Sequence, residues 1–246
     1  MKDLLKETAL LDFSNLKIRE LIEKNRWHNL EPLVQIRKIY LFVRDEIAFG
    51  YNEDDLIPAS KVLKDGYGQC NTKATLFMAL LRAVGIPCRL HGFTINKKLQ
   101  KGAMTGIVYI AAPQEIIHSW VEVYYDGIWY NLEGFILDMP YLNALQQKFS
   151  LNKGSFCGCG VATNNFKNPV VDFNMNDTYI QKEGIVQDFG LINSPDEFFA
   201  EHTQRISNFK RILFKNYGRH KMNENVAKIR EENNIGTNNV SDKESA

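Results

Sequence analysis

The stretch that decides the fold covers residues 60–87 and reads SKVLKDGYGQCNTKATLFMALLRAVGIP. Gly66 and Gly68 allow a tight turn ahead of a single cysteine, Cys70. The residues that follow predict a helix over 71–84, which ends at Gly85 because Pro87 lies just beyond. Apolar residues occupy two stripes of this helix, so we expect it to be buried on most of its sides.

Cys70 therefore lies at the N-terminus of a helix inside the core. Unpaired backbone N–H groups and the positive end of the helix dipole stabilise a thiolate at such a position. The same N–H groups can hold an oxyanion. A cysteine that packs as a small apolar residue is the alternative interpretation, and this stretch alone favours neither.

The bulk properties indicate a soluble globular protein. The chain has 246 residues, of which 44% are apolar and 24% charged, enough for one large domain or two small ones. The net charge of +1 gives no reason to expect nucleic acid or an anionic membrane as a partner. We find no apolar run of signal-peptide or membrane-span length, and four cysteines do not form a disulfide framework. We therefore expect a cytoplasmic protein.

Hydrophobic periodicity divides the chain into a mixed core and a helical end. We expect a catalytic core over residues 1–150, an Asn- and Gly-rich loop region packed on it over 151–193, a helical extension over 194–232 and a disordered tail over 233–246. The expected helices cover 15–27, 31–47, 61–63, 71–84, a long segment from Ser194 toward Gly218, and 223–232. The expected strands cover 88–95, 106–111, 115–125 and 128–133.

Two of these strands bear on the role of Cys70. Asp126 and Gly127 predict a two-residue hairpin turn. In that register Trp120 lies opposite Glu133, and His118 becomes a diagonal neighbour of Glu133 on the same face, with Cα atoms ~7–8 Å apart. A glutamate carboxylate can reach an imidazole over that distance.

The hairpin thus supplies the groups that a cysteine nucleophile requires. Cys70 would attack a carbonyl, His118 would act as base and then as acid, and Glu133 would orient the imidazole. His91 is the second candidate for the base, but no acid is placed beside it by the pattern.

The order of these motifs resembles the transglutaminase-like superfamily, which has a papain-like α+β core. The resemblance is carried by ASKVLKDGYGQC at 59–70, LLRAVGIPCR at 80–89, HSWVEVY at 118–124 and WYNLE at 129–133. It implies an α+β fold in which a central buried helix packs on an antiparallel sheet, followed here by the C-terminal helical extension. It also implies that Cys70 is the nucleophile and His118 the base, with Glu133 standing where the family usually has Asp.

The resemblance implies acyl transfer from a peptide or side-chain amide through a thioester. Hydrolysis is the expected outcome, although proteases, amidases and transglutaminases all occur in this superfamily. A catalytically inactive module that binds peptides is the alternative. We expect a peptide or protein substrate, a monomer, and contributions to substrate binding from Gln69, Gly68 and Trp120.

Two further features have ordinary interpretations. Cys157 and Cys159 flank a glycine, but a zinc site needs about four ligands, so we interpret this segment as a turn and expect no metal and no cofactor. The basic residues of the C-terminal helix fit a solvated helix face better than a nucleic-acid site. They are Lys210, Arg211, Lys215, Arg219, His220 and Lys221.

Overall fold

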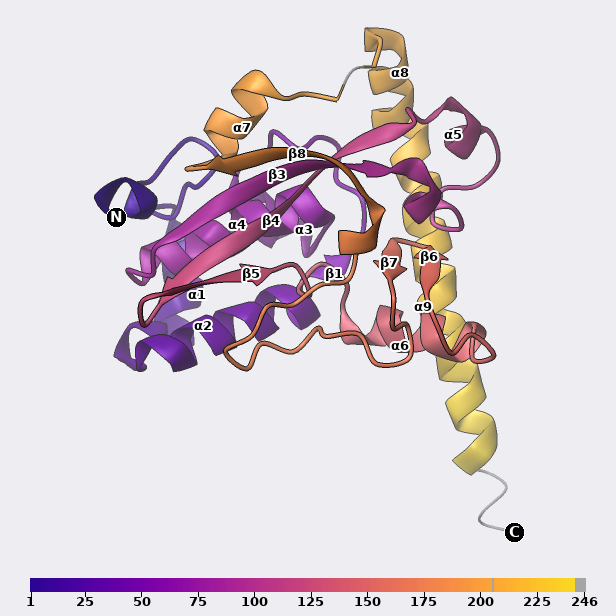
Figure 1. Ribbon diagram of the computed structural model, residues 1–246, viewed down its shortest axis with the longest axis horizontal. Helices are drawn as coiled ribbons and strands as arrows, with labels where there is room; N and C mark the ends of the chain where they lie inside the picture. The colour runs from indigo at the N-terminus through magenta and orange to yellow at the C-terminus, as the bar shows by residue number, and fades with distance from the viewer. Residues whose placement is uncertain (205, 242–246) are drawn as a thin grey trace.

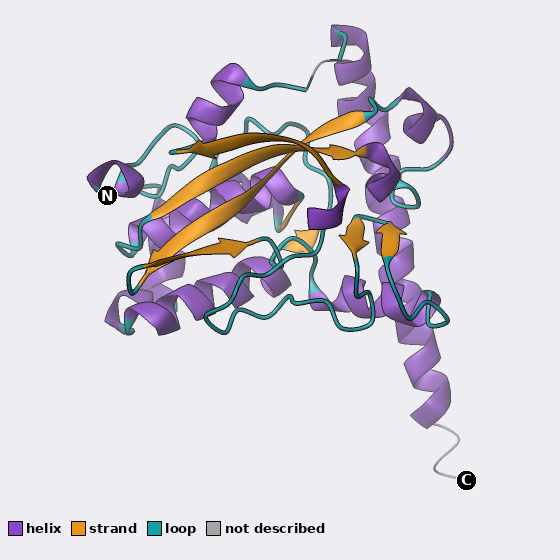
Figure 2. Ribbon diagram, viewed as in Figure 1, coloured by secondary structure: helices purple, strands orange, loops and turns teal. Residues whose placement is uncertain are grey.

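The computed structural model describes residues 1–204 and 206–241 and has an α+β fold (Figures 1 and 2). A four-stranded antiparallel sheet, in the order β5-β4-β3-β8, lies across the long helix α4. The sheet strands are β3 (Cys88–Asn96), β4 (Glu115–Tyr125), β5 (Ile128–Leu132) and β8 (Ile185–Ile192). Two small pairs complete the strands: β1 (Ala48–Phe49) with β2 (Tyr67–Gly68), and β6 (Phe156–Gly158) with β7 (Val161–Thr163). The predicted fold class is confirmed.

Helix α4 (Cys70–Ala83) is the centre of the core. Every residue from Cys70 to Arg82 is buried, as the two apolar stripes predict. The helix starts at Cys70 because the backbone N–H of Gln69 donates to Thr72 Oγ1 at 3.1 Å, which closes its first turn. It ends before Gly85, whose φ of +83° suits a residue without a side chain.

Helices α2 and α3 contact α4. Helices α1, α2 and α3 precede α4 along the chain, and α9 passes along one side of the molecule (Figure 1). The α-helices are α1 (Leu16–Lys24), α2 (Pro32–Leu41), α3 (Ala59–Asp65), α5 (Gly106–Ala111), α6 (Met139–Lys148), α7 (Pro195–Glu201), α8 (Asn208–Leu213) and α9 (Arg219–Ser241). The short 3-10 and π turns are η1 (Lys2–Leu5), η2 (Trp27–Asn29), η3 (Phe42–Glu46), η4 (Lys97–Gln100), η5 (Lys182–Gly184) and η6 (Phe214–Gly218).

The β4–β5 hairpin has the predicted register. Tyr125 pairs with Ile128, and Val121 with Leu132. Asp126 and Gly127 have φ values of +50° and +80°, the positive values that a two-residue turn between twisted strands requires. Because the side-chain period of a strand is two, this register fixes which residues of β4 and β5 share a face.

Two predictions of secondary-structure elements were wrong. Residues 106–111 form helix α5 instead of a strand, because β-propensity is outweighed where no neighbouring strand can pair. The long helix expected from Ser194 ends at Glu201, and a new helix, α8, starts at Asn208. Between them Gln204 accepts a hydrogen bond from the N–H of Ile117 at 3.0 Å and donates to Glu115 O at 3.1 Å, which keeps the chain extended beside β4.

The region after residue 150 is more ordered than the sequence suggests. Residues 151–193 were expected to form loops, but they contain the β6–β7 pair and β8, the edge strand of the main sheet. Helix α9 continues through residues 233–241 of the segment predicted to be disordered and ends at Ser241. Residues 242–246 lie outside the described part of the chain.

Candidate active site

Cys70 lies where α4 begins and is 6% exposed. Its side chain forms part of the wall of a cavity, while the rest of the helix is enclosed by the core. A thiol at this position is close to the unpaired N–H groups and the positive end of the α4 dipole. The predicted setting of the cysteine is therefore present, with a narrow opening to solvent.

His118 and Glu133 form a fully buried pair. His118 Nε2 lies 2.8 Å from Glu133 Oε1, and both side chains have no exposed surface. The contact joins β4 to the residue that follows β5, as the hairpin register predicts. Among residues 1–204 and 206–241, His118 Nδ1 has no hydrogen-bond partner.

Cys70 and Glu133 both affect the charge state of His118. Burial lowers the pKa of His118, but interactions with Cys70 and with the Glu133 carboxylate outweigh it and raise that pKa to about 10. The imidazolium is therefore the stable form of His118 at neutral pH. A charged imidazole that interacts with both a cysteine and a carboxylate is an arrangement that thiol catalysis uses.

The other oxygen of Glu133 is held by backbone N–H groups that the sequence did not reveal. Glu133 Oε2 accepts hydrogen bonds from the N–H groups of Ile180, Gln181 and Lys182, at 2.8, 2.8 and 3.1 Å. Thr178 Oγ1 also accepts from the N–H groups of Glu133 and Gly134. We call residues 178–182 the carboxylate loop. No sequence pattern marks it, because three of its residues act through the main chain.

The three residues predicted to bind substrate have different positions. Gln69 lines the cavity; its Oε1 accepts from the N–H of Asn52 and its Nε2 donates to Asp55 Oδ1, each at 2.9 Å. Gly68 is buried in β2 and does not line the cavity formed by the described residues; a Cβ there would lie 2.7 Å from Thr72 Oγ1, so its glycine serves close packing. Trp120 also lies outside that cavity wall and donates to Asn131 Oδ1 at 3.1 Å.

Asp55 is a cavity residue that the sequence analysis did not single out. Burial raises the pKa of the Asp55 carboxyl to about 6, although hydrogen bonds from Gln69 and Asn71 oppose this. Its contact with Gln69 places it beside the first turn of α4. A carboxyl that is partly protonated near neutral pH thus faces the space in front of Cys70.

The remaining candidates lie apart from Cys70. His91 is held by Glu122 at 3.1 Å and Asp188 at 2.9 Å on the β3–β8 side of the sheet, so it does have acidic neighbours. Cys157 is exposed and Cys159 is buried. No group of three or more metal-ligating side chains occurs within the described ranges, and none of the helices described there has the length and apolar content of a membrane span.

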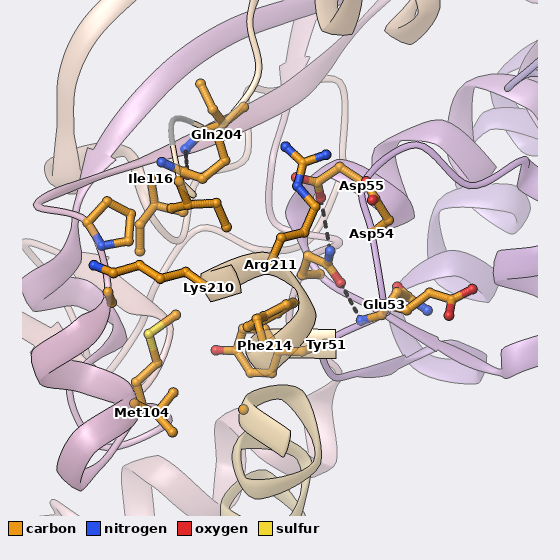
Figure 3. Close-up of a pocket in the computed structure, with 18 of the residues that line it drawn as sticks. Tyr51, Glu53, Asp54, Asp55, Met104, Ile116, Gln204, Lys210, Arg211 and Phe214 are labelled. Atoms are coloured by element: carbon orange, nitrogen blue, oxygen red, sulfur yellow. Dashed lines mark hydrogen bonds between the residues drawn. The ribbon is translucent and has the colours of Figure 1, made fainter. Parts of the chain in front are cut away.

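The cavity that Cys70 lines has a volume of about 530 Å³. Its walls come from the loop after β1, the start of α4, α5, the start of β4, and the segment 199–218 (Figure 3). Figure 3 shows Arg211 of α8 extending across this space toward Asp55. We call residues 208–218, which form α8 and η6, the cover segment.

A few polar contacts hold the cover segment in place. Lys215 Nζ lies 2.9 Å from Glu53 Oε2, and Lys210 Nζ donates to Ala111 O at 3.2 Å. The following helix α9 is fixed more firmly, because Asn223 exchanges two hydrogen bonds with the backbone of Tyr51, at 2.7 and 3.1 Å. The basic residues of this region therefore form part of the wall and rim of the cavity as well as a solvated face.

A family model matches the core segment of this chain. Residues 23–134 match the family model of the transglutaminase-like superfamily, which confirms the resemblance for this segment. No curated protein matches the chain.

Solved structures that match include a candidate cysteine protease from Cytophaga hutchinsonii, with 13% identity and a TM-score of 0.45. Red sea bream transglutaminase also matches, with 18% identity and a TM-score of 0.30. The alignments cover 79% and 54% of this chain but only 47% and 25% of those two chains.

Proposed function

We propose that this transglutaminase-like chain is a cysteine-dependent acyl-transfer enzyme that cleaves peptide or side-chain amides, with water as the acceptor. One observation carries the proposal. His118 is fully buried and its Nε2 contacts Glu133, while Nδ1 has no hydrogen-bond partner among the described residues and interaction with Cys70 raises the pKa of the ring. A buried ring nitrogen without a partner is costly unless it serves a reacting group.

In the first step, the Cys70 thiolate attacks the amide carbonyl carbon. The carbonyl oxygen becomes an oxyanion, which N–H groups at the start of α4 can stabilise. The imidazolium of His118 then gives its proton to the amide nitrogen, the C–N bond breaks, and an amine leaves. The acyl group remains on Cys70 as a thioester.

In the second step, neutral His118 removes a proton from water. The resulting hydroxide attacks the thioester carbonyl, the C–S bond breaks, and a carboxylic acid leaves with Cys70 restored as thiolate beside imidazolium. Glu133 keeps its charge throughout, because its task is to orient the ring and stabilise the imidazolium. The carboxylate loop supports this role by fixing the second oxygen of Glu133.

Site-resolved alkylation tests this proposal. Iodoacetamide at neutral pH should label the nearly buried Cys70 faster than the exposed Cys157, since partial desolvation of the Cys157 sulfur raises its pKa and keeps it a thiol. His118→Ala should reduce labelling of Cys70 by about a hundredfold, on the scale of one activating base, and leave Cys157 unchanged. Labelling of Cys70 that is slower than that of Cys157, or independent of His118, would contradict the proposal.

The inactive peptide-binding module remains the second candidate, favoured by the 6% exposure of Cys70 behind the cover segment. Incubation with a peptide library followed by mass spectrometry separates the two functions. The enzyme predicts a thioester on Cys70 and a carboxylic acid product. The binding module predicts peptide retention without either.

A further inference from the structure

The cavity beside Cys70 has two unlike parts. Polar side chains line the wall next to Cys70, at Gln69, Asn71 and Asp55. The apolar part of the wall comes from several elements. Six of the residues that form this apolar part are Met104, Ile107, Val108, Ile117, Leu213 and Phe214.

The cavity is larger than the reaction itself requires. An amide group needs only the sulfur, the imidazole and the oxyanion donors, whereas the cavity measures about 530 Å³. Cavities of roughly 300–1,000 Å³ with mainly apolar walls and a few polar groups are typical of ligand sites. Open space against apolar side chains also forfeits dispersion contacts, which an apolar ligand group would restore.

The position of His118 indicates which part of a substrate this space receives. Cys70 lines the cavity, while His118 is fully buried and does not belong to the wall that the described residues form. The leaving nitrogen must approach His118, because that residue supplies its proton. The group bonded to the carbonyl carbon is then directed away from the imidazole, into the cavity.

We propose that the substrate is an amide whose acyl part carries a large apolar group, and that this cavity binds that group. The inference rests on the proposed function and adds the substrate class to it. An alkyl chain and a bulky apolar peptide side chain share the required chemistry. Much of the selecting wall lies in segment 199–218, outside the 23–134 segment that matches the superfamily.

Chloromethyl ketones test the inference, because they place a chosen group on the acyl side. The Cys70 thiolate displaces chloride, so that one C–S bond forms as one C–Cl bond breaks. The apolar reagents are 1-chlorodecan-2-one, for an alkyl chain, and the chloromethyl ketone of acetyl-phenylalanine, for a peptide. The chloromethyl ketones of acetyl-lysine and acetyl-glycine are the references, and each rate at Cys70 is divided by the rate with glutathione.

At least one apolar reagent should react at least about tenfold faster than the lysine reagent, a difference of about 1.4 kcal/mol. The faster of the two apolar reagents identifies the alkyl or the peptide source. Equal corrected rates for all reagents would overturn the inference.

Matched variants test whether this cavity causes the faster reaction of the apolar reagents. Ile107 and Ile110 are 72% and 77% exposed on α5, but only Ile107 lines the cavity as described. On α8, Leu213 and Ile212 are 46% and 60% exposed, and only Leu213 lines the cavity as described. Ile107→Asp and Leu213→Asp should lower the apolar rates about fivefold to tenfold, while Ile110→Asp and Ile212→Asp leave them unchanged. All four sites are exposed enough for the protein to fold, and equal effects within each pair would contradict the assignment.

Two measurements separate this inference from the proposed function. If the glycine reagent labels Cys70 no faster in the wild type than in His118→Ala, the proposed function fails. The inference is then tested separately from the reaction. Calorimetry measures whether the unreactive compounds decan-2-one and acetyl-phenylalanine amide bind to the Cys70→Ser variant. Saturable binding of either compound that Leu213→Asp weakens supports it, and no detectable binding of both overturns it.

Discussion

The two sides of the candidate active site are built in different ways. On one side, His118 and Glu133 are fully buried, and strand register and the carboxylate loop fix their positions. On the other side, the cover segment is held over the cavity by exposed or half-exposed contacts such as Lys215 with Glu53. The comparison teaches that the reacting groups have one arrangement imposed by the core, whereas the wall that meets the substrate is attached by interactions of small free energy.

The largest expected effect comes from breaking the rigid side at Glu133. Glu133→Gln removes the charge that stabilises the imidazolium, and we expect a loss of about 10³-fold in the alkylation rate of Cys70 or in turnover. Glu133→Asp keeps the charge but shortens the side chain by about 1.5 Å, so one carboxylate can no longer reach both His118 and the carboxylate loop. We expect a loss of about tenfold for it.

Rates for these two variants, measured beside thermal unfolding, separate chemistry from folding. The rate should be highest for the wild type, lower for Glu133→Asp and lowest for Glu133→Gln. If Glu133→Gln is as active as the wild type, Glu133 does not orient His118. If Glu133→Asp is more active than the wild type, the length of the glutamate side chain is not what joins the imidazole to the carboxylate loop.

A smaller effect is expected where the two sides meet, at Asp55. The pKa of Asp55 is raised to about 6 in the folded protein. Between about pH 4 and 6 the Asp55 carboxyl is therefore protonated in the folded state and ionised in the unfolded state. Stability must therefore fall as the pH rises through this window and stay lower above it. Asp55→Asn should remove that loss and raise the free energy of unfolding at pH 8 by about 1–3 kcal/mol, with little change at pH 4.

Denaturant unfolding at both pH values measures this difference, with Asp54→Asn as the control from the same loop. The account fails for Asp55 if its variant shows the same change at pH 4 and pH 8. It also fails if Asp54→Asn produces the same dependence on pH.

The smallest effect on stability belongs to the cover segment. Lys215 and Glu53 are 52% and 31% exposed, and exposed ion pairs contribute roughly 0–1 kcal/mol. Glu53→Gln should therefore leave the unfolding temperature almost unchanged. It should nevertheless increase the labelling of Cys70 by a bulky maleimide about threefold, because the cover segment opens more often.

The reference for that experiment is iodoacetamide, which is small enough to depend less on opening. An equal change for both reagents would mean that the ion pair affects the thiol itself. A slower reaction with the bulky reagent would show that the pair does not hold the cover segment closed.

The sequence predicts the buried side of the site better than the side formed by the cover segment. The α4 helix, the hairpin turn at Asp126 and Gly127, and the His118–Glu133 contact all follow from periodicity and register, which are local rules. The superfamily match then confirms the core segment. The roles of Cys70, His118 and Glu133 remain predictions that the experiments above test.

The parts that the sequence did not predict depend on long-range contacts. The carboxylate loop binds Glu133 through backbone N–H groups, which every residue except proline carries, so no residue type marks it. The break between α7 and α8 depends on Gln204 meeting β4, which only the assembled fold brings together. The close approach of Gly68 to Thr72, where a Cβ would lie 2.7 Å from Oγ1, likewise depends on the folded chain.

The most direct test of the central claim is the titration of His118 by NMR, with His118→Ala used to assign its signals. The account predicts that His118 remains an imidazolium up to about pH 10 in the wild type. It also predicts that Cys70→Ala lowers the pKa, because the negative partner of the ring is then removed while burial still opposes the charge. An unchanged titration of His118 after Cys70→Ala would contradict the claim that the two residues form a thiolate–imidazolium pair.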